Sequence, residues 1–200
     1  DAKPFAINNQ DFQLQEYKSI IGTDSSLWDS TIGKNNMLSQ NGLILLEKTF
    51  KHAKEQEHQW RFRYVQIVDD ANCPILMTFL TESLWKNDML APASVSQKLE
   101  QQRKSDPYLQ TARVLSLGCL FTEGNHLYVN EEHPQVDILL IQLLEYIENL
   151  GHTWKVDMTV LRDFDMNYKW SKLFQDQGYF PMDMPESCVL QNLNHKMEKD

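Results

Sequence analysis

The segment from residue 113 to residue 161 constrains the fold most, because it places a strongly amphipathic helix between two apolar strands. Residues 136–150 carry apolar side chains at helical spacing along one face, namely Val136, Leu139, Leu140, Leu143, Leu144 and Ile147. Gly151 follows where a helix commonly ends. Residues 113–121 and 154–161 are typical of strands. Two strands joined through a helix form a parallel pair in a sheet covered by helices, so we expect an α/β fold.

A hairpin and a helix are predicted upstream of this segment. Residues 61–69 alternate in hydrophobicity, and Ile75–Thr81 is a second apolar strand after the turn residues Asp69–Asn72. Ser39 can cap a helix whose apolar residues recur at Leu43, Leu46 and Phe50. These elements extend the predicted sheet and add a helix that covers it.

The remaining elements are weaker predictions. We expect a short helix near Asp11–Ile20, a polar helix over Ser94–Lys104 and a long polar connection over residues 122–135. A second amphipathic helix over residues 166–177, capped by Asp163 or Asp165 and ended by Gly178, is expected to pack on the sheet. Short β segments at residues 179–180 and 187–190 would follow.

The charge composition limits the kinds of molecule that the protein can bind. The 200 residues contain 19 Lys and Arg against 28 Asp and Glu, which leaves a net charge of −9. This acidity argues against a chain that lies along nucleic acid or an anionic membrane, and no apolar run is long enough to span a bilayer. Any binding of a phosphate-bearing small molecule would need a local basic pocket.

The cysteines indicate the cellular compartment of the protein, and the first residue indicates how the chain begins. Cys73, Cys119 and Cys188 lie far apart and form no CxxC pair, which favours reduced thiols in the cytoplasm over disulfides or a zinc site. The chain begins at Asp1 without Met and without a charged-then-apolar leader, so we expect a trimmed chain or a domain cut from a longer protein rather than a secreted precursor.

The C-terminal helix carries a spaced motif. Asn167, Trp170, Leu173-Phe174 and Gly178-Tyr179 fall after a strand and before a predicted hairpin. This spacing resembles the last helix of the GNAT acyltransferase superfamily. The resemblance implies a GNAT-like mixed central β-sheet flanked by helices, and acetyl-CoA or another acyl-CoA as co-substrate.

The N-terminal half adds to the resemblance. Trp28, Asn36–Ser39 and Leu43–Glu47 are similar to GNAT-like families related to the Fem-type aminoacyl transferases. Three further segments look like GNAT-like domains fused to PLP-dependent α-oxoamine synthases: Leu84–Leu90, Arg113–Gly118 and Thr122–Tyr128. The resemblance divides the chain into an extension (1–24), a GNAT-like domain (25–192) and a tail (193–200). It implies a PLP-dependent synthase as a partner in the same polypeptide or pathway.

Acyl transfer to an amine needs a base for the ammonium, donors for the oxyanion and a proton for the sulfur. Glu123 is the candidate base or substrate-binding carboxylate, although a solvated loop glutamate is the alternative. Tyr168 is the candidate acid, or else a surface aromatic. The resemblance implies that acyl-CoA lies in a gap between the two parallel strands beside Leu120–Asn125. The cofactor-binding residues it implies are Leu120, Phe121, Gly124, Asn125, Asn167 and Phe174.

Other side chains allow two interpretations. Cys119 is a small core residue or an acyl acceptor. Arg61, Arg63, Arg103 and Lys104 could meet CoA phosphates or form an outer strand face. A metal site at Glu131-Glu132-His133 with His126 is rejected, because no helical i, i+4 spacing supports it.

Two departures from the GNAT pattern keep a second function open. The Q/R-x-x-G-x-G/A loop that binds the CoA pyrophosphate is missing, since Gly124 is the only glycine of residues 122–135. Phe174 stands where a proton-donating Tyr is usual. The first hypothesis is an N-acyltransferase that uses acyl-CoA and a small amine or amino ketone. The alternatives are a non-catalytic GNAT-like binding or dimerisation module and, opposed by the acidity, a Fem-type transferase that uses aminoacyl-tRNA.

Overall fold

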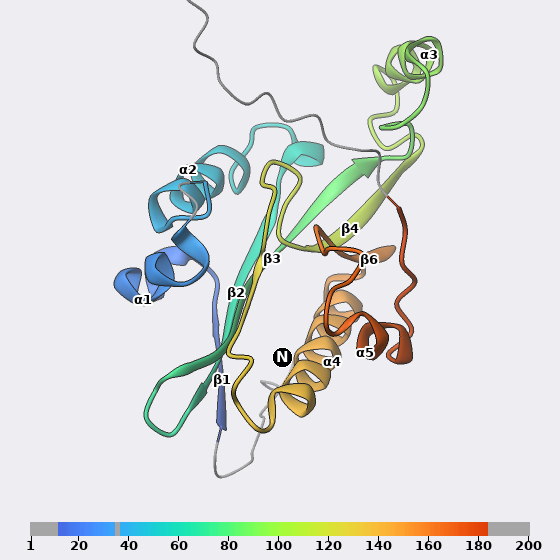
Figure 1. Ribbon diagram of the computed structural model, residues 1–200. Helices are drawn as coiled ribbons and strands as arrows, with labels where there is room; N and C mark the ends of the chain where they lie inside the picture. The colour runs from blue at the N-terminus through green and yellow to red at the C-terminus, as the bar shows by residue number, and fades with distance from the viewer. Residues whose placement is uncertain (1–11, 35–36, 184–200) are drawn as a thin grey trace, which may run out of the picture.

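The computed structural model describes residues 12–34 and 37–183, and these form one mixed sheet with helices on both faces (Figure 1). Four antiparallel strands lie side by side in chain order, followed by one parallel strand at the far edge: β1 (Phe12–Tyr17), β2 (Arg61–Asp69), β3 (Pro74–Lys86), β4 (Thr111–Leu117) and β6 (Met158–Leu161). A sixth strand, β5 (Leu127–Val129), pairs with β3. The predicted α/β class, with a mixed sheet flanked by helices, is confirmed.

The helices divide between the two faces of the sheet (Figure 1). α1 (Ser25–Ser30) and α2 (Gln40–Phe50) cover one face, together with the 3-10 turns Ile20–Gly22, Ile32–Lys34 and Gln56–His58. The core beneath them contains Trp28, Leu43, Tyr64 and Phe79. α4 (Val136–Trp154) and α5 (Ser171–Asp176) cover the other face, where Leu140 and Ile147 of α4 share a core with Leu80 and Leu115 of the sheet. α3 (Ala93–Arg103) lies between β3 and β4 in the chain, at the outer end of these strands.

α4 confirms the helix predicted at residue 136 but ends later than expected. Gly151 lies inside the helix, and Lys155 adopts the left-handed conformation (φ 57°) that ends it. A Cβ on Gly151 would lie 3.2 Å from Val156 Cγ2. The glycine therefore permits close packing at the turn after the helix, and the predicted C-cap was wrong. Trp154 belongs to this helix and not to the strand.

The helix expected near Asp11–Ile20 is a strand instead. In β1, Leu14 lies opposite Ile67 and Tyr17 opposite Tyr64. Phe12 and Leu14 pack against the α4 core. The pairing with β2 outweighs local helical preference, so residues 12–17 of the predicted extension belong to the sheet.

α5 is shorter than predicted, and neither Asp163 nor Asp165 caps it. Trp170 precedes the helix, and its Nε1 donates to Asp137 Oδ1 of α4 at 2.7 Å. Because this tertiary contact fixes the chain, the helix begins only at Ser171. Gly178 (φ 92°) lies directly after the end of the helix, as expected. Residues 179–180 are not a strand, and the segment predicted at residues 187–190 lies outside the described residues, as does Cys188.

The other elements confirm the predictions in outline. Ser39 Oγ accepts from Gly42 N and caps α2. Asp69 Oδ1 accepts from the backbone N–H groups of Ala71 and Cys73 in the hairpin turn. β3 runs five residues beyond the predicted end at Thr81, where it pairs with β4. Within the described ranges, no helix is long and apolar enough to cross a bilayer.

Candidate functional site at the carboxyl ends of β4 and β6

The pairing of the two parallel strands ends at Leu117 and Leu161, and the region where the two chain segments separate beyond these residues is called the opening. β4 and β6 pair from Val114↔Met158 to Leu117↔Leu161, and both strands stop there. The chain after β4 bridges once to β3 at Gly118, leaves the sheet over residues 119–126 and returns as β5 beside Leu76–Thr78. The strand predicted over residues 113–121 is therefore interrupted. Ligands of open α/β sheets bind at the carboxyl ends of strands, which makes this opening the candidate site.

Gly118 allows the chain to leave the sheet in this way. Its φ is 90°, and a Cβ there would lie 2.7 Å from Cγ of the His126 ring. Gly118 N donates to Phe79 O at 2.9 Å, and Thr81 Oγ1 donates to Gly118 O at 2.6 Å. The glycine lets the imidazole lie directly against the backbone.

A buried polar network fills the base of the loop. His126 is 1% exposed, its Nε2 lies 2.8 Å from Thr122 Oγ1, and this hydroxyl lies 3.2 Å from Cys119 Sγ. The Phe79 ring meets the imidazole edge-on, with 5.6 Å between centroids. Burial, and then the nearby Arg162 charge, lower the pKa of His126 to about 4, so the ring is neutral at pH 7.

The end of β6 faces this network. Arg162 Nη1 donates to Cys119 O across the opening, and Arg162 Nη2 lies 3.6 Å from Asp163 Oδ1. Asp163 Oδ2 lies 3.5 Å from His126 Nδ1. Burial raises the pKa of Asp163 above its ordinary value, while the Arg162 charge opposes the rise. The structure thus brings together a thiol, a hydroxyl, an imidazole, a guanidinium and a carboxylate.

The predicted residues of the loop lie on the α2 side of the sheet. Leu120 packs against the core under α2, and Phe121, 58% exposed, stacks on Phe50 and Trp60 at centroid distances of 5.2 and 5.6 Å. Three polar or flexible positions of the loop are exposed: Glu123, Gly124 and Asn125. The loop therefore presents Glu123 to solvent beside an aromatic stack.

The predicted residues near α5 lie elsewhere. Phe174 is buried in the α4 core, and Tyr168 packs against it and Phe164, with centroids 5.7 and 4.5 Å away. Burial, and then Glu131, raise the pKa of Tyr168 to about 12, so its phenol is protonated at pH 7. Asn167 is exposed. These three belong to the α4 side of the sheet and the loop residues to the α2 side.

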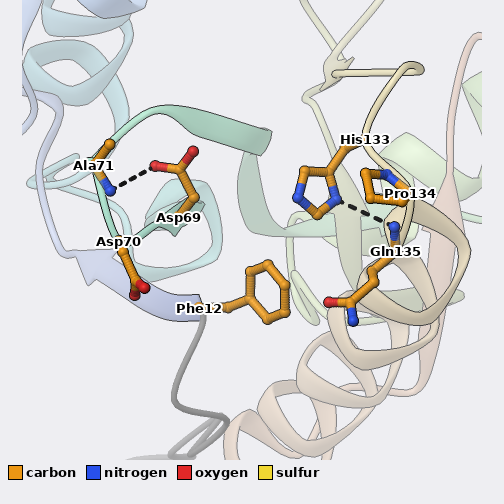
Figure 2. A pocket seen from close by; sticks show the side chains of 7 residues that line it. All are labelled: Phe12, Asp69, Asp70, Ala71, His133, Pro134 and Gln135. Atoms are coloured by element: carbon orange, nitrogen blue, oxygen red, sulfur yellow. Dashed lines mark hydrogen bonds between the residues drawn. The ribbon is translucent and has the colours of Figure 1, made fainter.

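The start of α4 is acidic. The chain before it contributes Glu131, Glu132 and His133, and Asp137 lies in the first helical turn. A cleft of about 390 Å³ lies beside this loop (Figure 2), lined by Phe12, Asp69, Asp70, Ala71, His133, Pro134 and Gln135. His133 Nδ1 accepts from Gln135 N at 3.3 Å, and the ring meets Phe12 edge-on. These carboxylates do not fit a pyrophosphate, because they would repel it.

The predicted basic cluster is divided between two places, because Arg61 and Arg63 lie on β2 and Arg103 and Lys104 at the end of α3. Arg61 and Arg63 lie over the Trp154 ring at the end of α4, at 4.7 and 5.5 Å. Arg61 and Arg113 hold the buried Glu82 carboxylate at 2.6 and 2.7 Å. Arg103 is buried against Asp88 at 2.5 Å. These three arginines therefore serve ion pairs within the fold, and Lys104 is exposed beside Arg103.

Sequence reasoning missed the role of His126, Thr122, Arg162 and Asp163. No local motif links them, since Thr122 and His126 lie on the loop and the other two follow β6. Gly118 in an apolar strand was the available signal, because it marked a close approach to the backbone. Across residues 12–34 and 37–183, no group of three or more His, Cys, Asp or Glu side chains gathers as a metal site requires.

Comparison with known proteins gives only distant structural likenesses. No family model matches the sequence, and no curated protein matches it. A tetramutant of the BH1408 protein from Bacillus halodurans is similar at 13% identity and a TM-score of 0.47, over 88% of this chain and 99% of that chain. A point mutant of the same protein gives 12% identity and a TM-score of 0.44, over 89% and 99%. Aminoglycoside N-acetyltransferase AAC(6')-Iy in complex with CoA gives 12% identity and a TM-score of 0.47, over 94% and 99%. Likenesses with TM-scores below 0.5 do not indicate a function. Only the residues of this chain can indicate one.

Proposed function

We propose that the protein is a GNAT-like N-acyltransferase that moves an acyl group from an acyl thioester such as acetyl-CoA to a small primary amine or amino ketone. The observation that carries the proposal is the opening beyond Leu117 and Leu161, where the parallel strands end and a loop with Glu123 begins. The GNAT resemblance implies a pantetheine arm in such a gap. The order of strands and helices from β4 to α5 agrees with that resemblance.

The acyl-CoA donor would be bound through its pantetheine and thioester end and not through its phosphates. Acidic residues surround the start of α4, so the phosphates of CoA gain no favourable charge there. Leu120, Phe121, Gly124 and Asn125 are the proposed contacts of the pantetheine arm, with Asn167 near the α5 side. Phe174 is buried in the core and supports Tyr168 by packing.

Two residues are proposed for the proton transfers. Glu123, exposed on the loop, would take a proton from the ammonium of the acceptor. Tyr168 packs on the α4 side of the sheet and Glu123 lies on the loop of the α2 side, so a thioester must lie between the ends of β4 and β6 to meet both. The Tyr168 phenol, protonated at pH 7, would then supply a proton to the leaving thiolate. A PLP-dependent synthase that makes the amine, and a cytoplasmic location, stay predictions from the sequence.

The test compares two donors. We expect acetyl-CoA and S-acetyl-pantetheine, added at the same concentration, to raise the melting temperature equally, because the phosphates of CoA would add nothing to binding. Free thiol should appear when primary amines are added. Glu123→Gln should abolish thiol release and keep donor binding. Unchanged turnover in this variant would remove Glu123 from the mechanism.

A non-catalytic binding module is the second candidate. The Arg162 contact to Cys119 O across the opening and the acidic start of α4 favour it. No thermal shift with either donor and no thiol release across a broad amine panel would support the module and contradict the transferase.

A further inference from the structure

Asp163, whose side chain is 25% exposed, differs from the buried carboxylates Glu47 and Glu82 in having unfilled hydrogen-bonding capacity. Glu82 is held by two arginines at 2.6 and 2.7 Å, and Glu47 accepts from Ile20 N and Ser19 Oγ at 2.7 and 2.8 Å. Asp163 has two contacts within the described residues, at 3.5 and 3.6 Å, and both are longer than a hydrogen bond. A carboxylate offers about four acceptor sites, so this one can accept N–H groups from a ligand.

Asp163 lies in a tight turn. Its φ is 61°, in the left-handed region that aspartate and asparagine adopt more readily than other non-glycine residues. The position is the second residue after β6, beside the carboxyl ends of the parallel pair. The turn therefore places the Asp163 side chain beside the ends of β4 and β6.

A second polar group points at the carboxylate from inside the protein. His126 is 99% buried, and its Nδ1 has no hydrogen-bond partner in the described chain although it lies 3.5 Å from Asp163 Oδ2. Its neutral imidazole does not neutralise the carboxylate at pH 7. Arg162 donates to Cys119 O through Nη1, and its Nη2, 3.6 Å from Asp163 Oδ1, partly balances the carboxylate charge on that side, which leaves Oδ2 for a ligand. The Asp163 side chain is 25% exposed, which leaves its outer side accessible to a ligand.

We propose that the Asp163 carboxylate binds the ammonium group of the amine acceptor, with His126 as a positioning residue behind it. The inference rests on the proposed transferase function and adds the residue that recognises the acceptor. A primary ammonium fits because it offers three N–H donors and a positive charge to an acceptor-only group. Glu123 follows Thr122 directly, so both carboxylates flank the same hydrogen-bonded network.

Asp163→Asn is the variant that tests the site, because asparagine keeps the size of the side chain and tolerates the left-handed conformation. Asp165→Asn is the matched control, since it makes the same chemical change two residues away on an exposed position. The probes are n-butylamine and aminoacetone, with N-butylacetamide as the uncharged analogue. Binding to the full chain is measured by NMR titration of backbone amides.

We expect saturable binding of the amines, no binding of the amide, a loss of about tenfold or more in Asp163→Asn and no change in Asp165→Asn. Equal amine binding by Asp163→Asn and the unaltered protein would overturn the inference, as would the absence of saturable binding. Thiol release separates the two proposals. Amine binding that depends on Asp163 without thiol release contradicts the transferase alone, and thiol release that Asp163→Asn leaves intact contradicts the Asp163 site alone.

Discussion

At the scale of single residues, Gly118 and His126 form one unit. The glycine has a left-handed φ, and the imidazole occupies the space where a Cβ would stand. Any other residue at position 118 would meet both backbone strain and a clash.

We therefore expect Gly118→Ala to lower the free energy of unfolding by about 3 kcal/mol. Gly178→Ala is the control, because Gly178 has a similar φ of 92° but nothing lies within 4 Å of its Cβ position. It should cost only the backbone strain, about 1 kcal/mol. Urea unfolding measures both, and equal losses would show that the contact with His126 is unimportant.

The buried imidazole also predicts a dependence of stability on pH. The unfolded chain binds a proton at His126 near pH 6.5, whereas the folded protein does so only near pH 4. Stability should therefore fall as the pH drops from 6.5 toward 4, by at most about 3 kcal/mol. Asp163 opposes this loss at its lower end, since its raised pKa favours the protonated folded state, and Arg162 is the other charged group facing the ring.

His126→Gln removes the titrating ring and should flatten this slope. Unfolding in urea at pH 4.5 and 6.5 measures the difference. The same slope in both proteins would mean that other groups control acid stability.

At the scale of elements, α3 is attached through polar contacts, and Arg103 makes the buried ones. Arg103 is the buried residue of this helix, and it contacts Asp88 and the backbone oxygens of Leu109 and Gln110. Hydrogen bonds to Arg103 lower the pKa of Asp88. α3 thus lacks an apolar core of its own.

Arg103→Gln should release α3 without unfolding the sheet. We expect amide exchange in residues 93–103 to become about tenfold faster or more, while α4 keeps its protection. Lys104→Gln, an adjacent exposed position, is the control. A global loss of protection in Arg103→Gln would contradict this separation.

An element can be predicted from the sequence when the residues that determine it lie close together in the chain. The α4 face repeats at helical spacing over 15 residues, and the hairpin carries its own turn, so both were found locally. β1 depends on its partner β2, and α5 begins where Trp170 meets Asp137 of another helix. The candidate site was predicted only in part: Glu123 and the loop were identified, whereas Asp163 and His126 meet through tertiary structure. An aspartate that looked like a helix cap has its contacts at the opening of the sheet.

At the scale of the whole molecule, the sheet carries a core on each face. Leu43 belongs to the core under α2, and Leu140 to the core under α4. Both cores rest on the same central strands, so loss of either should destabilise the other.

Leu43→Ala and Leu140→Ala should each lower the free energy of unfolding by about 2–5 kcal/mol and keep a single transition. Tryptophan fluorescence and far-UV circular dichroism should give coincident midpoints, since Trp28 reports one core and Trp170 the other. Separate midpoints would show that the faces unfold independently.

Both β4 and β5 pair with the same edge of β3, and this pairing determines how the candidate site can change. β4 and β5 lie along one edge, so the loop from Cys119 to His126 starts and finishes on a single line of backbone. Residues could be added or removed between these anchors while both strands keep their register. A lineage, or a protein engineer, could therefore remodel the α2 side of the proposed site by varying the length of one loop, and leave the strands that anchor it unchanged.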